Sequence, residues 1–240
     1  MAKCVFLCRY FCSFVKPFPV KISIVIPTLN EGEQIRRAID LAWQSGADEV
    51  IVADGGSADG SLDFLKTQNC VVVSSAPGRG TQLNAGAAVA TGDVFLFLHA
   101  DNSLVESGCD QIRTALQDKS VLFGGFKQSV DNNKKIYRWI ESGNNLRVKW
   151  QGLVYGDQAM FIRRDVFQRE GQFPSIVLME DFEFSKRLRR ISKPILLDGP
   201  TFVSARRWEK AGPINQTIRN WFLAAAYRFG ASPTWLAKHY

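Results

Sequence analysis

Polar residues follow each of four short apolar runs in the first half of the sequence, and their types suit metal and phosphate chemistry. They form the strings Pro27-Thr28-Leu29-Asn30-Glu31, Asp54-Gly55-Gly56-Ser57, Pro77-Gly78-Arg79-Gly80 and His99-Ala100-Asp101. Asp101 follows the very apolar run Val-Phe-Leu-Phe-Leu and has an imidazole two residues before it. A carboxylate in this position is a candidate ligand for Mg²⁺ or Mn²⁺, which favour oxygen donors. The alternative is that these residues only shape loops and cap helices, which we favour for Asn30 taken alone.

The second half of the sequence carries further candidates for chemistry. The pair Glu180-Asp181 could supply a general base, because a carboxylate can take a proton from an attacking hydroxyl. Arg206 and Arg207 could grip phosphate oxygens with their forked donors. The alternatives are acidic residues at a helix N-terminus and a solvated basic turn beside a buried indole, Trp208. Asp157 could position a hydroxyl or merely hold its own loop.

An alternation of β-branched runs with helical stretches predicts βαβ units around a mainly parallel sheet. We expect strands at 22–26, 49–53, 71–74 and 94–98, a helix after the first strand, and helices at about 81–90 and 107–117. Asn30 and Glu33 form a candidate capping pair for the first helix. The second half predicts strands at 121–130, 158–162 and 195–197 and helices at 134–147, 180–190 and 214–229, as in a mixed sheet edge. Because parallel strands end at one edge of a sheet, the polar strings should meet there.

Composition and charge fit one catalytic-sized domain and narrow its partners. The chain has 240 residues, of which 46% are hydrophobic, and a formal charge of +7. A positive field suits a phosphate-rich ligand, an anionic membrane surface or a nucleic acid. Nucleic acid is the weakest of the three, since the basic runs carry no interleaved aromatic residues. The dinucleotide motif G-x-G-x-x-G and the phosphate loop G-x-x-x-x-G-K-[ST] are both absent from the sequence.

Residues 1–20 read as an apolar leader outside the domain. Cys4, Cys8 and Cys12 do not form a disulfide framework, and a tight metal site would need a fourth ligand. The apolar runs of the leader are too short for a spanning helix. We therefore expect a cytoplasmic protein, with peripheral contact at a membrane as the second option. The aromatic face of the helix at 214–229 is expected to pack on the domain, with a bilayer surface as its alternative partner.

Taken together, these strings resemble glycosyltransferase family 2 and its GT-A fold. The resemblance rests on Ile-Ser-Ile-Val-Ile-Pro-Thr-Leu-Asn-Glu, Asp-Gly-Gly-Ser and His-Ala-Asp, followed in order by Gly-Asp-Gln-Ala, Met-Glu-Asp and Ser-Ala-Arg-Arg-Trp. The strings Ala-Pro-Gly-Arg-Gly, Leu-His-Ala-Asp and Ser-Ala-Arg-Arg-Trp look like the arsenosugar-biosynthesis-type subgroup. The resemblance covers roughly residues 20 to 240. It implies a single domain over 21–240, with a nucleotide-sugar-binding half at 21–120 and an acceptor-binding half at 121–240.

The resemblance also implies roles for single residues. Asp181 would be the general base, and Asp101 would hold Mg²⁺ or Mn²⁺ at the donor diphosphate. His99 stands where the family has the first aspartate of its D-x-D element, so both a donor contact and simple packing stay open for it. The donor would contact Pro27, Asn30, Glu31, Asp54, Arg79, Asn84, His99, Asp101 and Arg207. The acceptor would contact Asp157, Gln158, Glu180 and Trp208.

The activity that this resemblance implies is inverting sugar transfer from a nucleoside-diphosphate donor, with UDP-sugars preferred, to an acceptor hydroxyl. The acceptor is not specified by the sequence, although the subgroup points to a small molecule. Two other functions are weighed against it. A metal-dependent nucleotidyltransferase of similar fold would release pyrophosphate, and a non-catalytic sugar-nucleotide-binding protein would not need its carboxylates. The spread of Asp54, Asp101 and Asp181 over separate strand and helix ends speaks against the last.

Overall fold

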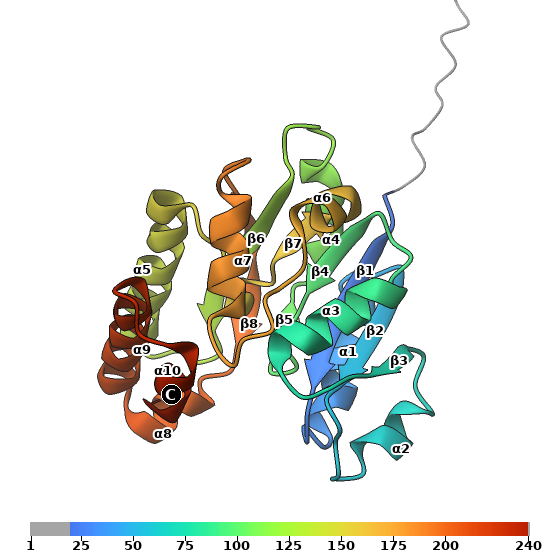
Figure 1. Cartoon of the computed structure of the whole chain (residues 1–240), viewed down its shortest axis with the longest axis horizontal. Coiled ribbons are helices and arrows are strands. Elements are labelled where there is room, and N and C mark those ends of the chain that lie inside the picture. The colour runs from blue at the N-terminus through green and yellow to red at the C-terminus, as the bar shows by residue number, and fades with distance from the viewer. Residues whose placement is uncertain (1–19, 240) are drawn as a thin grey trace, which may run out of the picture.

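One mixed β-sheet with helices on both faces forms the framework of the protein (Figure 1). The computed structural model describes residues 20–239. The eight strands lie in the order β3-β2-β1-β4-β7-β6-β8-β5. Their bounds are β1 Ile22–Thr28, β2 Glu49–Asp54, β3 Val71–Ser74, β4 Val94–Phe97, β5 Asn102–Leu104, β6 Phe123–Val130, β7 Phe161–Arg163 and β8 Ile195–Val203. This α/β arrangement, with parallel strands in the first half and a mixed edge in the second, agrees with the fold class expected from the sequence.

The helices alternate with these strands along the first half of the chain and cluster in the second half. Their bounds are α1 Gln34–Gln44, α2 Ser61–Leu65, α3 Arg79–Val89, α4 Gly108–Ala115, α5 Lys135–Gln151, α6 Arg164–Glu170, α7 Glu180–Leu188, α8 Arg206–Ala211, α9 Pro213–Arg228 and α10 Pro233–His239, with a 3₁₀ turn η1 at Gly156–Gln158. In the part of the chain that the structure covers, no helix combines the length and the apolar character needed to cross a bilayer.

Strand direction brings the polar strings together. Strand β1 pairs in parallel with β2 and β4, and β2 pairs in parallel with β3, so the carboxyl ends of all four lie at one edge. Strand β7 then pairs antiparallel with β4 and with β6. Strand β8 runs parallel to β6 and antiparallel to β5. The second half therefore extends the sheet past β4 as a mixed edge, as expected.

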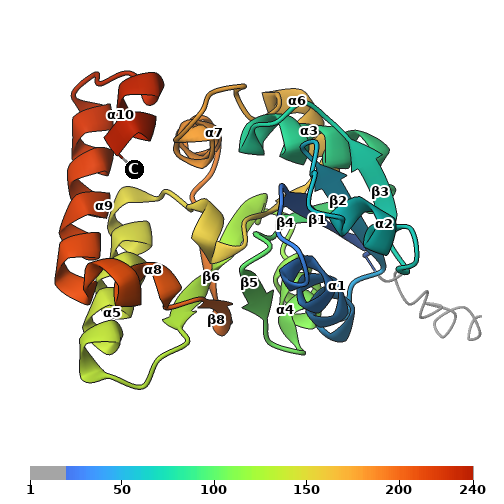
Figure 2. The same ribbon diagram turned by 90° about the horizontal axis from the view of Figure 1, so that it is seen from below.

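The core lies on both faces of the sheet because the strand side chains alternate between them. Ile24 of β1 and Leu96 of β4 pack with Ile39 of α1 and Ile112 of α4 on one face. On the other face, helices α3, α6 and α7 supply a second cluster that includes Phe184. Figure 2 shows α1 and α4 below the sheet and α3, α6 and α7 above it. The central strands are buried on both faces, which explains their almost wholly apolar runs.

Element boundaries depart from the sequence expectation where short elements meet. The strand expected at 158–162 begins only at Phe161, since Gly156–Gln158 forms a 3₁₀ turn whose cap, Ala159, has a positive φ. The strand expected at 195–197 continues to Val203 because it pairs with β6 and then with β5. Helices α2, α6, α8 and α10 and strand β5 are all short and were not expected. The predicted leader lies, apart from residue 20, outside the described residues, and so do Cys4, Cys8 and Cys12.

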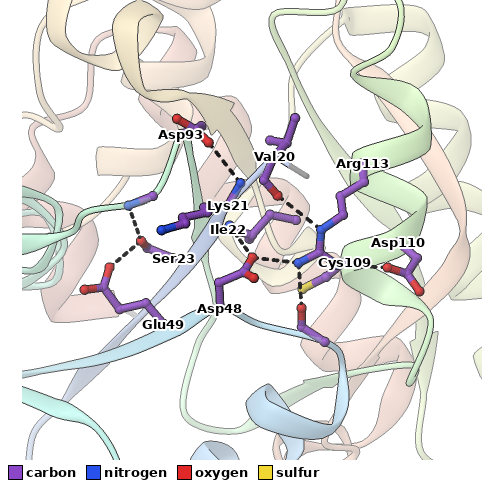
Figure 3. A network of polar contacts seen from close by, with 12 residues as sticks. Val20, Lys21, Ile22, Ser23, Asp48, Glu49, Asp93, Cys109, Asp110 and Arg113 are labelled. Atoms are coloured by element: carbon purple, nitrogen blue, oxygen red, sulfur yellow. Dashed lines mark hydrogen bonds and ion pairs between the residues drawn. The ribbon is translucent and has the colours of Figure 1, made fainter. Parts of the chain in front are cut away.

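A separate polar network lies at the amino end of the sheet, far from the polar strings (Figure 3). Arg113 Nη2 donates to Asp48 Oδ2 at 2.6 Å, and Asp48 Oδ2 also accepts the backbone N–H of Ile22 at 2.8 Å. Ser23 Oγ donates to Glu49 Oε2 at 2.5 Å and accepts the N–H of Gly92 at 2.9 Å. These groups satisfy one another, so we assign them to the attachment of α4 and the β1 start and not to chemistry.

Close packing of α3 on the sheet gives a first testable prediction. A Cβ added at Gly86 would lie well inside the van der Waals contact distance of Val25 Cγ1, and Val25 is β-branched and fully buried. We expect Gly86→Ala to lower the free energy of unfolding by about 1–3 kcal/mol, measured by urea denaturation. Gly143→Ala on α5 is the matched control, because the nearest atom there is 4.0 Å away. That variant should be neutral or stabilising, since alanine favours a helix. Equal stability of the two variants would contradict the packing argument.

Candidate active site

A cavity of about 170 Å³ lies at the carboxyl edge of the sheet, between the two halves of the chain. It is lined by seven of the residues that the sequence singles out, namely Arg79, His99, Asp101, Asp157, Asp181, Arg207 and Trp208. These residues come from α3, the β4–β5 turn, η1, α7 and α8. Of the four polar strings, the third and fourth reach this cavity through Arg79, His99 and Asp101, whereas the first two end β1 and β2 at the same edge of the sheet without lining it.

Asp181 and His99 meet at the backbone of Gly156. Asp181 Oδ2 accepts the N–H of Gly156 at 2.6 Å, and its Oδ1 accepts the N–H of Phe182 at 2.7 Å. A Cβ placed on Gly156 would be 2.5 Å from His99 Nε2 and 3.2 Å from Asp181 Oδ2. Only a glycine fits between the two side chains. The carboxylate is thus held in place by two backbone donors and still has lone pairs directed at the cavity.

His99 is a neutral imidazole in this setting. Burial lowers its pKa well below 6.5, and the cations Arg79 and Arg207 lower that pKa further. A neutral ring can accept or donate a hydrogen bond to a ligand without adding charge. The structure thus places His99 on the cavity wall, where it could contact a ligand. The donor contact itself stays a prediction.

The Asp101 side chain lines two cavities and lies near the guanidinium group of Arg207. Arg207 Nη2 is 4.0 Å from Asp101 Oδ2, and the Asp101 side chain keeps about a quarter of its surface exposed. Asp101 also lines a second cavity of about 330 Å³ against α1, β5 and β8. Burial raises the pKa of Glu31, and the negative charge of Asp101 raises it further, so these two carboxyl groups are electrostatic neighbours. The site therefore gathers carboxylates with arginines close by.

Glu180 and Arg79 form an ion pair on one side of the cavity. Arg79 Nη1 is 3.0 Å from Glu180 Oε1, and Glu180 is almost fully buried while its Oε2 has no hydrogen-bond partner. Burial and the neighbouring Asp181 raise the pKa of Glu180, and Arg79 opposes that rise. Arg79 belongs to the cavity, whereas Glu180 lies behind it and orients the arginine.

Asp157 lies on another wall of the cavity with three residues that the sequence did not single out, Gln128, Arg147 and Tyr155. Its Oδ2 accepts Gln128 Nε2 at 2.9 Å, while its Oδ1 is buried without a hydrogen-bond partner. Burial raises the pKa of Asp157. The Tyr155 hydroxyl is also unpartnered, and the Arg147 guanidinium lies 3.7 Å from the centre of the Tyr155 ring. A buried acceptor and a buried hydroxyl that face a cavity are positioned for a polar ligand.

Four predicted donor residues lie at the ends of β1 and β2. Asp54 Oδ2 accepts the N–H groups of Gly56 at 2.8 Å and Ser57 at 3.1 Å, so the carboxylate shapes the glycine turn. Pro27 and Glu31 lie at the end of β1 and just beyond it. Asn30 was predicted to cap the first helix together with Glu33, and this prediction is wrong. Asn30 has a φ of 55°, and its Oδ1 accepts the N–H of Ala58 at 2.9 Å, which ties the β1 loop to the β2 loop.

Two other predicted site residues make contacts that hold the framework. Asn84 Nδ2 donates to the carbonyl of Phe173 at 2.8 Å, and Asn84 Oδ1 accepts the N–H of Phe173 at 2.9 Å. Gln158 is fully buried, and its Oε1 accepts the N–H of Tyr155 at 3.1 Å. Neither side chain is among those that line the two cavities. Their predicted ligand contacts remain untested, and the structure places them behind the cavity wall.

The residues at 206–208 open helix α8 and do not form an irregular turn. Trp208 is buried and meets Tyr137 edge to face with ring centres 6.5 Å apart. Arg206 Nη2 donates to Gln34 Oε1 at 2.8 Å, while Arg207 turns toward Asp101. The buried indole thus anchors the segment and orients one arginine to the site.

Sequence reasoning missed the contribution of helices α5 and α9. Arg147 of α5 and Gln216, Asn220 and Leu223 of α9 all line the cavity. They reach it through packing of helices that lie far apart in sequence, and no motif marks them. The sequence signal for these residues is a polar side chain within an otherwise apolar stretch of helix, as at Gln216.

This geometry supports three tasks in one place. A fixed carboxylate, Asp181, can accept a proton, and Arg79 and Arg207 can neutralise a phosphate group. Asp101 offers oxygen ligands for a divalent cation. Within residues 20–239, no group of three His, Cys, Asp or Glu side chains forms a ready-made metal cluster. A cation here would need oxygens from a ligand and from water to complete its coordination.

Comparison with known proteins places the sequence in a defined group. Residues 23–171, more than half of the chain, match the family described as Glycosyl transferase family 2. The PGL/p-HBAD biosynthesis glycosyltransferase of Mycobacterium tuberculosis strain H37Ra is 28% identical over 217 residues, which cover 82% of this chain and 79% of that protein. Glycosyltransferase AglJ of Haloferax volcanii is 38% identical over 65 residues, or 27% of this chain and 22% of AglJ.

Solved structures share the fold at low identity. The S. aureus TarS 1–349 structure in complex with UDP-GlcNAc gives a TM-score of 0.62 at 15% identity, over 77% of this chain and 58% of that one. The glucosyl-3-phosphoglycerate synthase of Mycobacterium tuberculosis, with Mn²⁺, UDP and phosphoglyceric acid, gives 0.59 at 19%, over 88% and 79%. PcManGT of Pyrobaculum calidifontis, with GDP-Man and Mn²⁺, gives 0.57 at 20%, over 91% and 67%. The arsenosugar-type subgroup stays a prediction.

Proposed function

Because the chain belongs to glycosyltransferase family 2, we propose that it moves a sugar from a nucleoside-diphosphate donor to an acceptor hydroxyl, with inversion at the sugar carbon. The observation that carries this proposal is the cavity in which Asp101, Asp181, Arg79 and Arg207 converge. A carboxylate base and cations that face a departing diphosphate are what a single displacement requires. Membership of the family makes the chain a glycosyltransferase, and the stereochemistry, donor and acceptor are the parts that we propose.

We assign the donor to the carboxyl edge of β1 to β4. Pro27, Asn30, Glu31 and Asp54 border the base and ribose in this proposal, and Asn84 supports the wall behind them. Arg79, His99, Asp101 and Arg207 border the diphosphate. UDP is the favoured nucleotide, since the TarS and glucosyl-3-phosphoglycerate synthase structures hold UDP or UDP-GlcNAc. The GDP-Man complex of PcManGT makes GDP-sugars a necessary comparison in any test.

The residues present fit a divalent cation only if the donor diphosphate and water supply its other ligands. Asp101 is partly exposed, and its described ion-pair partner, Arg207, is as far as 4.0 Å away, so the carboxylate can turn to a cation. Mg²⁺ and Mn²⁺ keep several waters and bind through one or two carboxylates plus substrate phosphates. When bound, such a cation would offset negative charge on the diphosphate. The Mn²⁺ in two of the related structures supports this assignment.

Asp181 is the proposed base, and the residues around it set its geometry. The N–H groups of Gly156 and Phe182 fix its two oxygens, so the carboxylate does not need to reorganise when an acceptor arrives. A proton from the acceptor hydroxyl would pass to Asp181 as the hydroxyl oxygen attacks the sugar carbon. Arg79 and Arg207 would stabilise the departing diphosphate. His99, held neutral, would border the reacting groups without adding charge.

The acceptor is assigned to the wall formed by η1, α5 and α8. Asp157 Oδ1 and the Tyr155 hydroxyl have no partners and can bind polar groups of a small molecule. Trp208 supplies an apolar edge, while Gln158 and Glu180 support the wall from behind. Asp157 is the leading candidate for an acceptor hydroxyl contact, because a lone buried oxygen gains most from a new donor.

The test is nucleoside-diphosphate release from a panel of UDP- and GDP-sugars, with Mn²⁺, with Mg²⁺ and with chelator. We expect release of UDP from at least one UDP-sugar with metal, and at least about tenfold less with chelator, because the diphosphate then lacks a counter-charge. The anomeric configuration of the product reports inversion. Release of pyrophosphate in place of a nucleoside diphosphate would contradict the proposal in favour of nucleotidyl transfer. Donor binding without any release would favour a sensor.

A further inference from the structure

Helix α9 exposes an apolar stripe to solvent, contrary to the expectation that its aromatic face packs on the domain. Leu223 is buried and Tyr227 packs against the domain, as expected. The stripe consists of Ile214, Ile218, Trp221, Phe222 and Phe229. These residues recur at helical spacing on one side of α9, and all are more than half exposed. The opposite side of the same helix lines the active-site cavity through Gln216 and Asn220.

Helix α5 carries a second apolar stripe that continues the first. Trp139 and Trp150 are each 79% exposed, and Leu146 is 47% exposed between them. The Trp221 ring of α9 lies 4.0 Å from a Cβ built at Gly143, which is on the exposed side of α5. Arg228 of α9 donates to Gln151 at the end of α5. Figures 1 and 2 both show α5 and α9 side by side at the outer flank of the molecule. We call the two stripes together the α5/α9 face.

The charges carried by α9 and α10 have one sign. The two helices contain Arg219, Arg228 and Lys238 and no Asp or Glu. On α5, Lys135 is exposed one turn before Trp139, and the one acidic residue of the helix, Glu141, is paired with Arg138 at 2.8 Å. An apolar surface bordered by cations complements an anionic surface that also has an apolar interior.

We propose that the α5/α9 face binds the surface of an anionic lipid bilayer. Tryptophan side chains suit the boundary between headgroups and acyl chains, because the ring is largely apolar and its N–H can stay hydrated. The exposed cations would contact lipid phosphates. The inference does not depend on the proposed sugar transfer, since none of its residues reaches the reacting groups.

A second copy of the chain is a weaker occupant for this face. In a twofold dimer the same surface meets itself, so the cations of one copy would lie near those of the other. The face holds no free carboxylate among the described residues to offset that repulsion. An anionic bilayer satisfies the apolar residues and the cations at once.

Vesicle flotation of the full chain tests the proposal. We expect the wild type to float with vesicles of phosphatidylglycerol and phosphatidylcholine in equal parts, and to float weakly with phosphatidylcholine alone or at high salt. The triple variant Trp139→Gln, Trp150→Gln, Phe222→Gln should have an affinity for the anionic vesicles that is lower by at least about tenfold. The reason is that three apolar side chains are no longer transferred from water to the bilayer. The double variant Lys135→Gln, Arg219→Gln should lose about fivefold per cation.

Val71→Gln is the matched control, because Val71 is an exposed apolar residue on β3 at the far end of the sheet. It should bind vesicles as the wild type does. Donor breakdown by the triple variant should equal that of the wild type, which separates lipid binding from catalysis and from misfolding. Wild type that stays with the buffer, or a triple variant that floats normally, would overturn the proposal. So would a wild-type dimer in light scattering that the triple variant dissociates.

Discussion

Replacement of Asp181 by Asn is expected to lower the turnover of donor by about 10²–10⁴-fold, because an amide cannot accept the proton that a carboxylate accepts. The substitution nearly preserves size. One of the two N–H donors, Gly156 or Phe182, would then face an amide N–H₂ group, since an amide has a single acceptor oxygen. Turnover is measured as nucleoside-diphosphate release under the best metal and donor conditions, with kcat and KM determined separately. A base substitution should act on kcat and leave the KM for donor within a few fold.

Glu183→Gln is the control on the same helix, since Glu183 is also acidic but pairs with Lys186 at 3.5 Å. It should keep turnover within about twofold, because Glu183 is a partly exposed ion-pair partner that does not line the cavity. Urea denaturation of both variants excludes a loss of structure. If Asp181→Asn turns over at the wild-type rate, Asp181 is not the base, and Asp157 on another wall of the cavity becomes the carboxylate to test.

The fold was predictable because most of its signal is local. Parallel strands buried on both faces require apolar runs, and the runs before Thr28, Asp54 and His99 could be assigned from sequence alone. The position of the site followed from strand direction, because polar residues after parallel strands must share one edge. Arg79, His99 and Asp101, which follow β3 and β4, do line one cavity, and their roles stay predictions.

Other parts of the site depend on contacts between distant segments. Asn30 resembles a helix cap in sequence, but its side chain bonds to Ala58 on the next loop, which no local pattern encodes. Glu180 and Asp181 are adjacent and chemically alike, yet one is buried against Arg79 and the other borders the cavity. Arg147 and Tyr155 are close in sequence, but they meet only because the chain turns back after α5 at Gly152, which has a left-handed conformation. Tertiary packing decides these cases.

Helix α9 shows the same limit of prediction from sequence, because its aromatic residues were expected to be buried and several are exposed. A stripe of large apolar residues at helical spacing normally indicates burial, and the sequence favoured that reading for residues 214–229. In the structure the same helix has a polar inner side at the cavity and an apolar outer side. Orientation about the helix axis is set by Leu223 and Leu236, which pack together, and by Trp208 of the preceding helix, whose Nε1 donates to Thr217. The hydrophobic pattern alone does not contain that information.

Asp101→Ala is expected to be the second most damaging substitution, with kcat/KM for the donor lowered by about 10²–10³-fold. Removal of the carboxylate takes away the oxygen ligands proposed for the cation, and it leaves Arg207 without this partner, so both charges that face the diphosphate change. Titration of activity with Mn²⁺ separates this role from simple packing. A metal ligand predicts that the half-saturating Mn²⁺ concentration rises at least about tenfold, whereas a packing residue leaves it unchanged.

Asp131→Ala is the matched control for this experiment, because Asp131 also lines the second cavity beside Asp101 but stands after β6 and not at the β4 end. Its half-saturating Mn²⁺ concentration should equal that of the wild type. If Asp101→Ala changes kcat/KM without moving the metal titration, the carboxylate acts by orienting Arg207, and the cation must be held elsewhere. If both variants shift the titration together, the second cavity takes part in metal binding. Because Asp101 lines both cavities and Asp131 lines only the second, the comparison reports which of the two cavities holds the cation.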